Sequence, residues 1–238
     1  YAVLYMHDGQ MLYDAEQTWN KQAWEVDEVM SKLLTENKIK ETIVVGIWNG
    51  GTTRHFDYFP QKPFEMLTQK QQDSIYNLER SEGVKLFNGK VNSDNYLKFI
   101  VKEVKPLIDK KYSVHTQKEH TFIAGSSMGG LISMYAICEY PAVFGGAACL
   151  STHWPGIFQV ENNPIPKVFY CYLKKKLPNP KNHKIYFDFG TETLDALYEP
   201  LQNEVDLIMK QKGFTTKNWL TKKFAGENHS EIAWQKRL

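Results

Sequence analysis

No segment of this sequence is long and apolar enough to span a membrane. A bilayer-spanning helix needs about 20 consecutive, mainly apolar residues, and every apolar run here is much shorter. Net charge is also nearly absent, because 29 Lys and Arg residues face 27 Asp and Glu residues, for a formal charge of +2. This balance gives no support for nucleic acid or an anionic membrane as a partner.

Cysteine is scarce as well, with three residues among 238 and no CxxC motif. Cys138, Cys149 and Cys171 stand in apolar surroundings. We therefore expect buried thiols rather than a disulfide framework. No cluster of His, Asp and Glu has the spacing of metal ligands, so we expect no metal site.

The chain has neither an initiator methionine nor a secretory signal. Tyr1 already belongs to a strand-like run, YAVLYM, and Leu238 falls within the last predicted helix. We interpret the sequence as a domain truncated at both ends, so it assigns no cellular compartment and no oligomeric state.

Short β-rich runs alternate with longer segments of helical period. This alternation is typical of a mainly parallel sheet with helices on both faces, and the length suits a single α/β domain over residues 1–238. We predict strands at Ala2–Met6, Thr42–Trp48, His120–Ala124, Gly146–Leu150, Lys184–Phe189 and Asn218–Phe224. We predict helices at Trp24–Glu36, Ser93–Lys110, Met128–Glu139, Asp195–Lys212 and Glu231–Leu238.

Two long connections interrupt the alternation, at about residues 49–92 and 153–183. The first is rich in Gly, aromatic and polar residues, and the second holds five prolines. We interpret both as insertions in the domain. Connections of this length are commonly functional or disordered.

The segment Gly125-Ser126-Ser127-Met128-Gly129 matches the pattern G-x-S-x-G. In that motif a strand turns sharply into a helix and presents a strained serine at the edge of the sheet. A strand-like run precedes the segment and a helical one follows it, as the motif requires. The alternatives are a simple turn of small residues or a phosphate-binding glycine loop, but the Lys-Ser/Thr end of such a loop is missing. Ser127 is the candidate nucleophile.

A nucleophilic serine needs a base and an orienting acid, which α/β-hydrolases supply in the order Ser, Asp/Glu, His. His229 follows the last predicted strand in the loop GENHS, so it is the candidate base. The acid should follow the strand before it, where Asp195 is the first candidate and Glu192 the alternative. Asp195 could equally be a charge that stabilises a helix N-terminus.

Two backbone amides should stabilise the oxyanion of such a reaction. One is the amide after the nucleophile, at Met128. The other should come from the loop after the first strand, MHDGQM, where the amide of Gln10 or Met11 can donate. We assign this second position to Gln10.

Six blocks of the chain carry a family resemblance: YAVLYMHDGQMLYD, VVGIWNGG with Arg54, IAGSSMGGLISMYAICEYPAVFGG, LSTHW, FDFGTETLD and GENHSEIAWQKRL. Together they resemble the "Putative esterase" family of the α/β-hydrolase superfamily. The resemblance implies an α/β-hydrolase fold and hydrolysis of carboxylic esters without a cofactor. Two departures stand out: the family's acid position falls on Thr193, and the strands that precede the HDG loop in the family are missing.

The resemblance leads us to expect a serine carboxylic ester hydrolase that works through an acyl-enzyme on a carbohydrate-linked or aromatic ester, of feruloyl or acetyl type. Alternatives are a siderophore lactone, a thioester such as S-formylglutathione, acyl transfer to an alcohol, or a catalytically inactive binding module. Trp48, His153, Trp154 and Arg54 are candidate substrate-binding residues. The aromatic residues could instead pack among themselves, and Arg54 could pair with Asp57.

Overall fold

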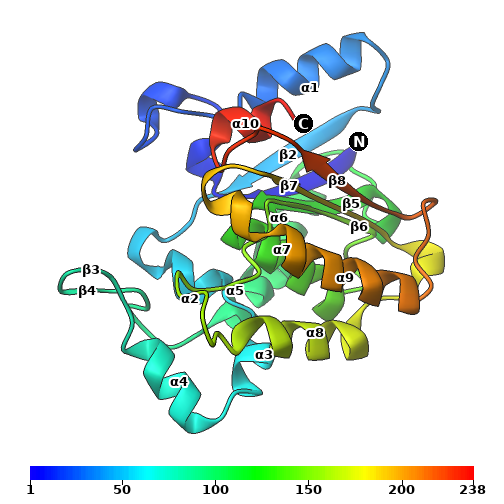
Figure 1. The fold of residues 1–238 in the computed structure, drawn as a ribbon. Coiled ribbons are helices and arrows are strands. Elements are labelled where there is room, and N and C mark those ends of the chain that lie inside the picture. Colours follow the sequence, from blue (N-terminus) through cyan, green and yellow to red (C-terminus); the bar gives the residue numbers. More distant parts are fainter.

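The computed structural model describes residues 1–238, and a six-stranded, all-parallel sheet forms its centre (Figure 1). In spatial order the strands are β2, β1, β5, β6, β7 and β8. Every predicted strand is present within two residues at each end, which confirms the α/β class. Their bounds are β1 Ala2–His7, β2 Thr42–Ile47, β5 Thr121–Ser126, β6 Gly146–Leu150, β7 Lys184–Gly190 and β8 Trp219–Phe224.

The strand register brings the ends of the central strands to one edge of the sheet. Ala124 lies beside Met6 on one side and Ala148 on the other, and Leu150 lies beside Asp188. The strand order reverses between β1 and β5, and open α/β sheets bind ligands at the carboxyl ends of strands at such a point. The loops after β1, β5, β6 and β7 therefore meet where a site is expected.

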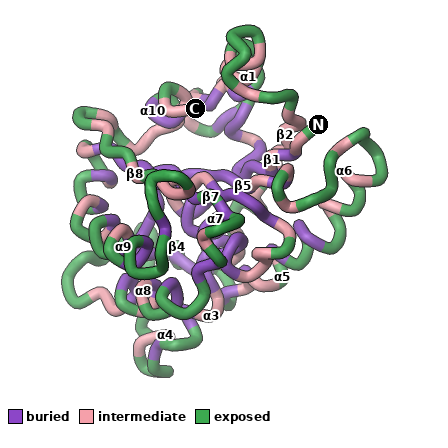
Figure 2. The backbone as a smooth tube through the Cα atoms, turned by 90° about the vertical axis from the view of Figure 1, so that its right-hand side faces the viewer, coloured by how far each residue is buried: buried purple, intermediate pink, exposed green.

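Helices cover both faces of the sheet, as predicted (Figure 1). The larger hydrophobic core lies between the sheet and a layer that includes α7 (Met128–Glu139), α8 (Ile165–Lys176) and α9 (Glu199–Gln211). A smaller core lies under α1 (Val26–Thr35) and α10 (Glu231–Gln235). Figure 2 shows the buried residues concentrated in the sheet and α7, where the residues from Met128 to Cys138 are all buried.

The first predicted insertion is mostly structured. It contains α2 (Arg54–Tyr58), α3 (Gln61–Glu65), α4 (Gln69–Tyr76) and the hairpin of β3 (Glu79–Ser81) and β4 (Val84–Lys85). The next helical segment is continuous but uneven: α5 (Ser93–Phe99), a π-helical turn (Ile100–Val104) and α6 (Lys105–Lys111). No helix combines the length and the hydrophobicity that a membrane crossing requires.

The second predicted insertion contains α8, which the sequence analysis missed. Its prolines were interpreted as loop signals, but Pro166 lies in the first turn of the helix, where the missing amide hydrogen costs nothing. Ile165, Phe169, Tyr172 and Leu173 recur at helical spacing and are buried. Cys171 lies on the outer side of α8 and is exposed, so the expectation of three buried thiols was wrong for this residue.

Three buried histidines make the fold sensitive to acid. Burial lowers the pKa of His7 to about 4 and that of His55 to about 3, and it lowers that of His153 well below its usual value. An ordinary histidine titrates near 6.5. As the pH falls below that value, the unfolded chain therefore takes up protons that the folded chain resists, and stability decreases.

We expect His55→Phe to weaken this pH dependence, because the ring of His55 packs against Phe59 and Phe87 and a phenyl ring takes up no proton. Between pH 6 and 4 the free energy of unfolding should fall less steeply than in the wild type, by about 1.4 kcal/mol per pH unit. Urea denaturation at several pH values measures this slope. Phe64→Leu is the control, since it should lower stability at every pH without changing the slope; an unchanged slope in His55→Phe would contradict the assignment.

Candidate active site

Ser127 occupies a strained turn between β5 and α7. Its backbone angles are φ 57° and ψ −120°, a region that residues other than glycine rarely adopt. A Cβ on Gly125 would lie 2.8 Å from the backbone carbon of Gly129, so the first glycine of the motif is needed for the turn to close. The amide of Ser127 donates to the carbonyl of Leu150 at 2.9 Å, which fixes the corner against β6.

His229 lies on the loop between β8 and α10, and its ring contacts Asp195. The distance between His229 Nδ1 and Asp195 Oδ1 is 2.5 Å, and the His229 amide donates to Thr193 Oγ1 at 3.0 Å. The residue Asp195 is 1% exposed, whereas Glu192 is exposed. The structure thus brings Asp195, and not Glu192, to His229.

Asp195 is held as a buried anion. Burial alone would raise its pKa, but hydrogen bonds from His229, from Ser151 Oγ at 2.6 Å and from the Gly190 amide at 2.6 Å lower it below its usual value. Such a carboxylate can orient an imidazole and stabilise its protonated form.

The side chain of Ser127 lies near the phenol of Tyr198. The structure has no hydrogen bond between Ser127 and His229, although both line the same cleft. Tyr198 also bonds His153 Nδ1 at 2.8 Å, and its ring packs edge-on against His229. Without substrate, hydrogen bonds between a nucleophile and its base are commonly long or absent.

The two predicted oxyanion donors have amides that are free to act. Met128 is the first residue of α7, and the first amides of a helix have no acceptor within it. In the loop after β1, the Met11 amide donates to the Asp8 carbonyl at 2.8 Å, so Gln10 remains the candidate donor of the two predicted amides. Gly9 permits this loop to approach β2, since a Cβ there would lie 2.6 Å from the Gly46 carbonyl carbon.

Arg54 forms a two-pronged ion pair with Asp8. Its Nε donates to Asp8 Oδ1 at 2.7 Å and its Nη2 to Asp8 Oδ2 at 2.8 Å, so the predicted alternative partner, Asp57, was wrong. Asp57 instead accepts from Thr53 Oγ1. The Nη1 group of Arg54 makes no hydrogen bond, and the residue lines the cleft beside Ser127.

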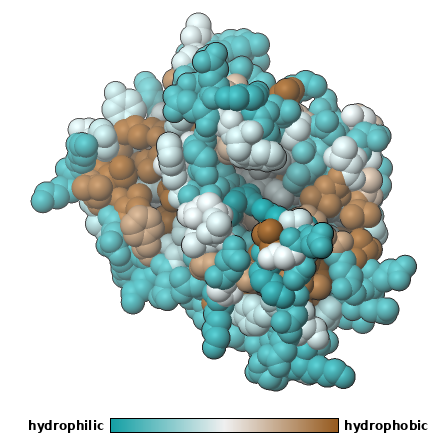
Figure 3. Space-filling model, turned by 90° about the vertical axis from the view of Figure 1, so that its left-hand side faces the viewer, coloured by the Kyte–Doolittle hydropathy of each residue, from teal (hydrophilic) through white to brown (hydrophobic).

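A cleft of about 850 Å³ joins these groups. It opens at the carboxyl ends of the strands, and Figure 3 shows a hollow with hydrophilic side chains near the centre of that side of the molecule. Three tryptophans, Trp19, Trp24 and Trp234, contribute apolar surface, and Trp19 is 84% exposed. Neutral polar residues predominate elsewhere: Gln10, Asn20, Gln22, Asn49, Thr52, Asn88 and Ser230.

Comparison with known proteins agrees with this architecture. A match to the family model described as "Putative esterase" extends over residues 1–238. The chain belongs to this esterase family. Among curated proteins it is 27% identical over 128 residues to the uncharacterized protein YbbA of Bacillus subtilis, and 28% identical over 131 residues to the carboxylesterase SOBER1 of Arabidopsis thaliana. These matches cover 51% and 55% of the chain and 47% and 50% of the relatives, so the chain spans about half the length of the curated relatives it matches.

Three solved structures, two of esterases and one of a serine hydrolase, share the fold of this family member. A ferulic acid esterase superimposes with a TM-score of 0.63 at 18% identity, covering 100% of this chain and 81% of the other. An IroE-like serine hydrolase from Shewanella oneidensis gives 0.66 at 18% identity, covering 100% and 68%. The enterobactin esterase FES from Shigella flexneri gives 0.64 at 15% identity, covering 98% and 49%. At these identities the similarity shows the α/β-hydrolase fold alone.

The remaining predicted substrate-binding residues of this esterase-family chain lie in different environments. Trp48 is 70% exposed, next to the loop that carries Gly9. His153 is buried against Tyr198. Trp154 is fully buried and donates its indole N–H to Gln202, so its side chain contacts the core and not the cleft. Trp19 was not among the predicted residues, because its sequence surroundings carry no motif.

The strain at Ser127 predicts that a glycine variant at this position is more stable than an alanine variant. We expect Ser127→Gly to be more stable than Ser127→Ala by about 1 kcal/mol, since glycine adopts this conformation freely and alanine keeps the strained Cβ. At Ser126, which lies in β5, the order should reverse because glycine weakens a strand. Urea denaturation of the four variants measures both differences, and a lower stability of Ser127→Gly than of Ser127→Ala would contradict the strain.

Proposed function

We propose that this protein is a serine carboxylic ester hydrolase that works through an acyl-enzyme. The observation that carries the proposal is the strained Ser127 elbow, which opens into a cleft that His229 also lines, with the buried Asp195 hydrogen-bonded behind His229. Family membership supports the same class of reaction.

In the proposed mechanism, Ser127 Oγ attacks the ester carbonyl while its proton passes to His229 Nε2. The resulting oxyanion accepts hydrogen bonds from the Met128 and Gln10 amides. His229 then gives the proton to the departing alkoxide, so the alcohol leaves and the acyl group stays on Ser127. Water repeats the sequence and releases the acid, and Asp195 stabilises the imidazolium at both stages.

For the substrate, we propose a carbohydrate-linked or aromatic ester. The amide and hydroxyl groups of the cleft suit an alcohol with many hydroxyls, and the exposed face of Trp19 suits a sugar ring or an aromatic acyl group. The free Nη1 of Arg54 offers one further donor to a carboxylate or hydroxyl of the substrate. Neighbours in fold include an enterobactin esterase and a ferulic acid esterase, and the name of the latter points to an aromatic acyl group.

A burst assay tests the acyl-enzyme. With p-nitrophenyl acetate and p-nitrophenyl ferulate, the wild type should release one equivalent of nitrophenol rapidly and then turn over, whereas Ser127→Ala should show neither phase. A fluorophosphonate should label the wild type and not the variant. Failure of the probe to label wild-type Ser127 would sink the proposal, and the rate ratio of the two esters would report on the acyl pocket.

The assignment of the acid has a matched test. Asp195→Asn should lower kcat by about 10³- to 10⁴-fold, because an amide can no longer hold the imidazole in the tautomer that accepts the serine proton. Glu192→Gln removes the same charge from a side chain that does not contact His229, so its kcat should stay within twofold of the wild type. Equal losses in the two variants would overturn the assignment.

A further inference from the structure

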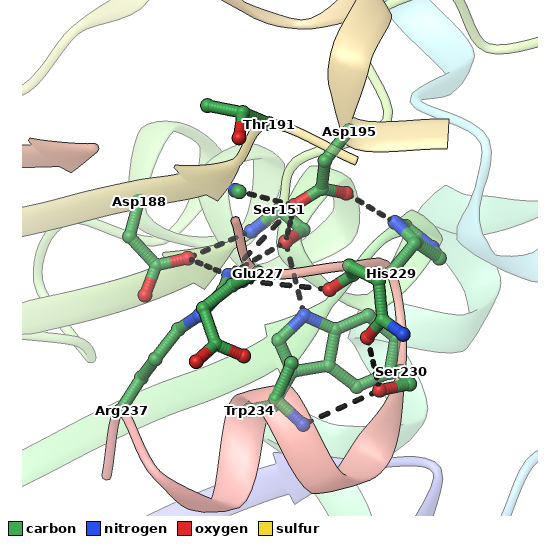
Figure 4. Close-up of polar contacts among 12 residues, drawn as sticks. Ser151, Asp188, Thr191, Asp195, Glu227, His229, Ser230, Trp234 and Arg237 are labelled. Atoms are coloured by element: carbon green, nitrogen blue, oxygen red, sulfur yellow. Dashed lines mark hydrogen bonds and ion pairs between the residues drawn. The ribbon is translucent and has the colours of Figure 1, made fainter. Parts of the chain in front are cut away.

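We propose that Ser151 and Arg237 are positioning residues that hold Asp195 as an anion and keep one of its oxygens for His229. The two residues act through Asp195, and the inference rests on the proposed function of the Asp195–His229 pair. Figure 4 shows them converging from the end of β6 and from the C-terminal segment after α10 onto the side of Asp195 that faces away from His229.

The neighbours of Ser151 leave its hydroxyl hydrogen only one acceptor. A hydroxyl has one hydrogen to donate and two lone pairs to accept with. Trp234 Nε1 and Arg237 Nη1 each lie 3.0 Å from Ser151 Oγ, and both groups can only donate. They fill both lone pairs, so the Ser151 hydrogen must point at Asp195 Oδ2, 2.6 Å away.

The two carboxylate oxygens of Asp195 therefore have different hydrogen-bond partners. Oδ2 accepts from the Ser151 hydroxyl and the Gly190 amide. Oδ1 accepts from His229. Ser151 itself has φ 41°, in the left-handed region, and its amide donates to Asp188 Oδ1 at 3.1 Å. The backbone is therefore held in an uncommon conformation that aims the hydroxyl at Asp195.

Arg237 places a buried cation between two buried carboxylates. Its Nη1 lies 3.2 Å from Asp188 Oδ1 and 3.8 Å from Asp195 Oδ2, and the arginine side chain is 1% exposed. A guanidinium stays protonated at any working pH. Its charge therefore stabilises the Asp195 anion and at the same time opposes the charge that His229 acquires during the reaction.

The other groups that face this cluster are few. Tyr186 donates to Asp188 Oδ2 at 3.1 Å, and the Arg237 guanidinium lies 5.0 Å from the Phe224 ring centre. The phenol ring of Tyr198 packs against His229 and bonds the ring of His153, and burial keeps both groups neutral. Asp188 is the group of this cluster that titrates nearest neutral pH, since burial raises its pKa to about 6.

Because Asp188 would complicate a pH profile, the test is made in its absence. Asp188→Asn is compared with the double variant Asp188→Asn/Arg237→Gln, which removes the buried charge pair together and so avoids an unpaired buried carboxylate. Loss of the cation should make His229 easier to protonate. The acidic limb of the pH profile of kcat/KM, where activity falls as His229 takes up a proton, should therefore move to higher pH by about half a unit to one unit.

Two more variants separate positioning from packing. Asp188→Asn/Arg237→Lys restores a cation and should return the limb toward its position in Asp188→Asn. Asp188→Asn/Ser151→Ala removes a donor from Asp195 and should move the limb upward relative to Asp188→Asn. Lower thermal stability with no movement of the limb in either the Arg237→Gln or the Ser151→Ala comparison would overturn the inference.

A readout without catalysis keeps this test separate from the proposed function. The His229 ring can be titrated by NMR with labelled histidine in the Ser127→Ala background, and its signal assigned by His229→Gln. With Asp188→Asn also present, the midpoint should move upward when Arg237→Gln is added, as the limb does. If fluorophosphonate labelling fails while this midpoint moves, the proposed function is wrong and the electrostatic link between Arg237 and His229 stands. If labelling is intact while the midpoint does not move, the proposed function stands and the electrostatic link is wrong.

Discussion

The site depends on one buried negative charge, that of Asp195. An ionised carboxylate without partners would be very costly in the interior. Its donors come from separate parts of the chain: the Gly190 amide at the end of β7, the Ser151 hydroxyl after β6 and His229 after β8. Each must be in place for the anion to be tolerated, so the same hydrogen bonds that stabilise Asp195 also fix the loops of the cleft relative to one another.

The strained backbone of Ser127, in contrast, is held in place by apolar packing and not by hydrogen bonds to a charge. Ser127 keeps its unfavourable backbone angles because α7 is buried from Met128 to Cys138 and packs into the large core. A shift of the elbow would expose much of that surface to water, at a cost of roughly 25 cal/mol per Å². The hydrophobic core thus holds the candidate nucleophile, and the polar network holds the candidate base.

The sequence revealed the parts of this site that follow from local patterns. The spacing around Ser127 predicted the elbow, because its steric demands fall on neighbouring residues. His229 and Asp195 came from their places after predicted strands, since parallel strands bring those loops to one edge. Ser151 and Arg237 could not be found in this way, because their contact joins residues 86 positions apart and no motif marks either one. Trp154 was misjudged for a related reason: a position near the edge of the sheet does not say whether the side chain turns outward or into the core.

Asp188 and Asp195 illustrate how the surroundings of a buried carboxylate decide whether its pKa is raised or lowered. Both are fully buried and both lie near Arg237, yet burial raises the pKa of Asp188 while donated hydrogen bonds lower that of Asp195. Asp195 is compensated by His229, whose ring also reaches the water of the cleft, being 15% exposed. Asp188 relies on a guanidinium that is itself buried and whose Nε lacks a partner. Desolvation therefore prevails at Asp188 and not at Asp195, and the carboxylate whose partner reaches the cleft is the one suited to orient the candidate base.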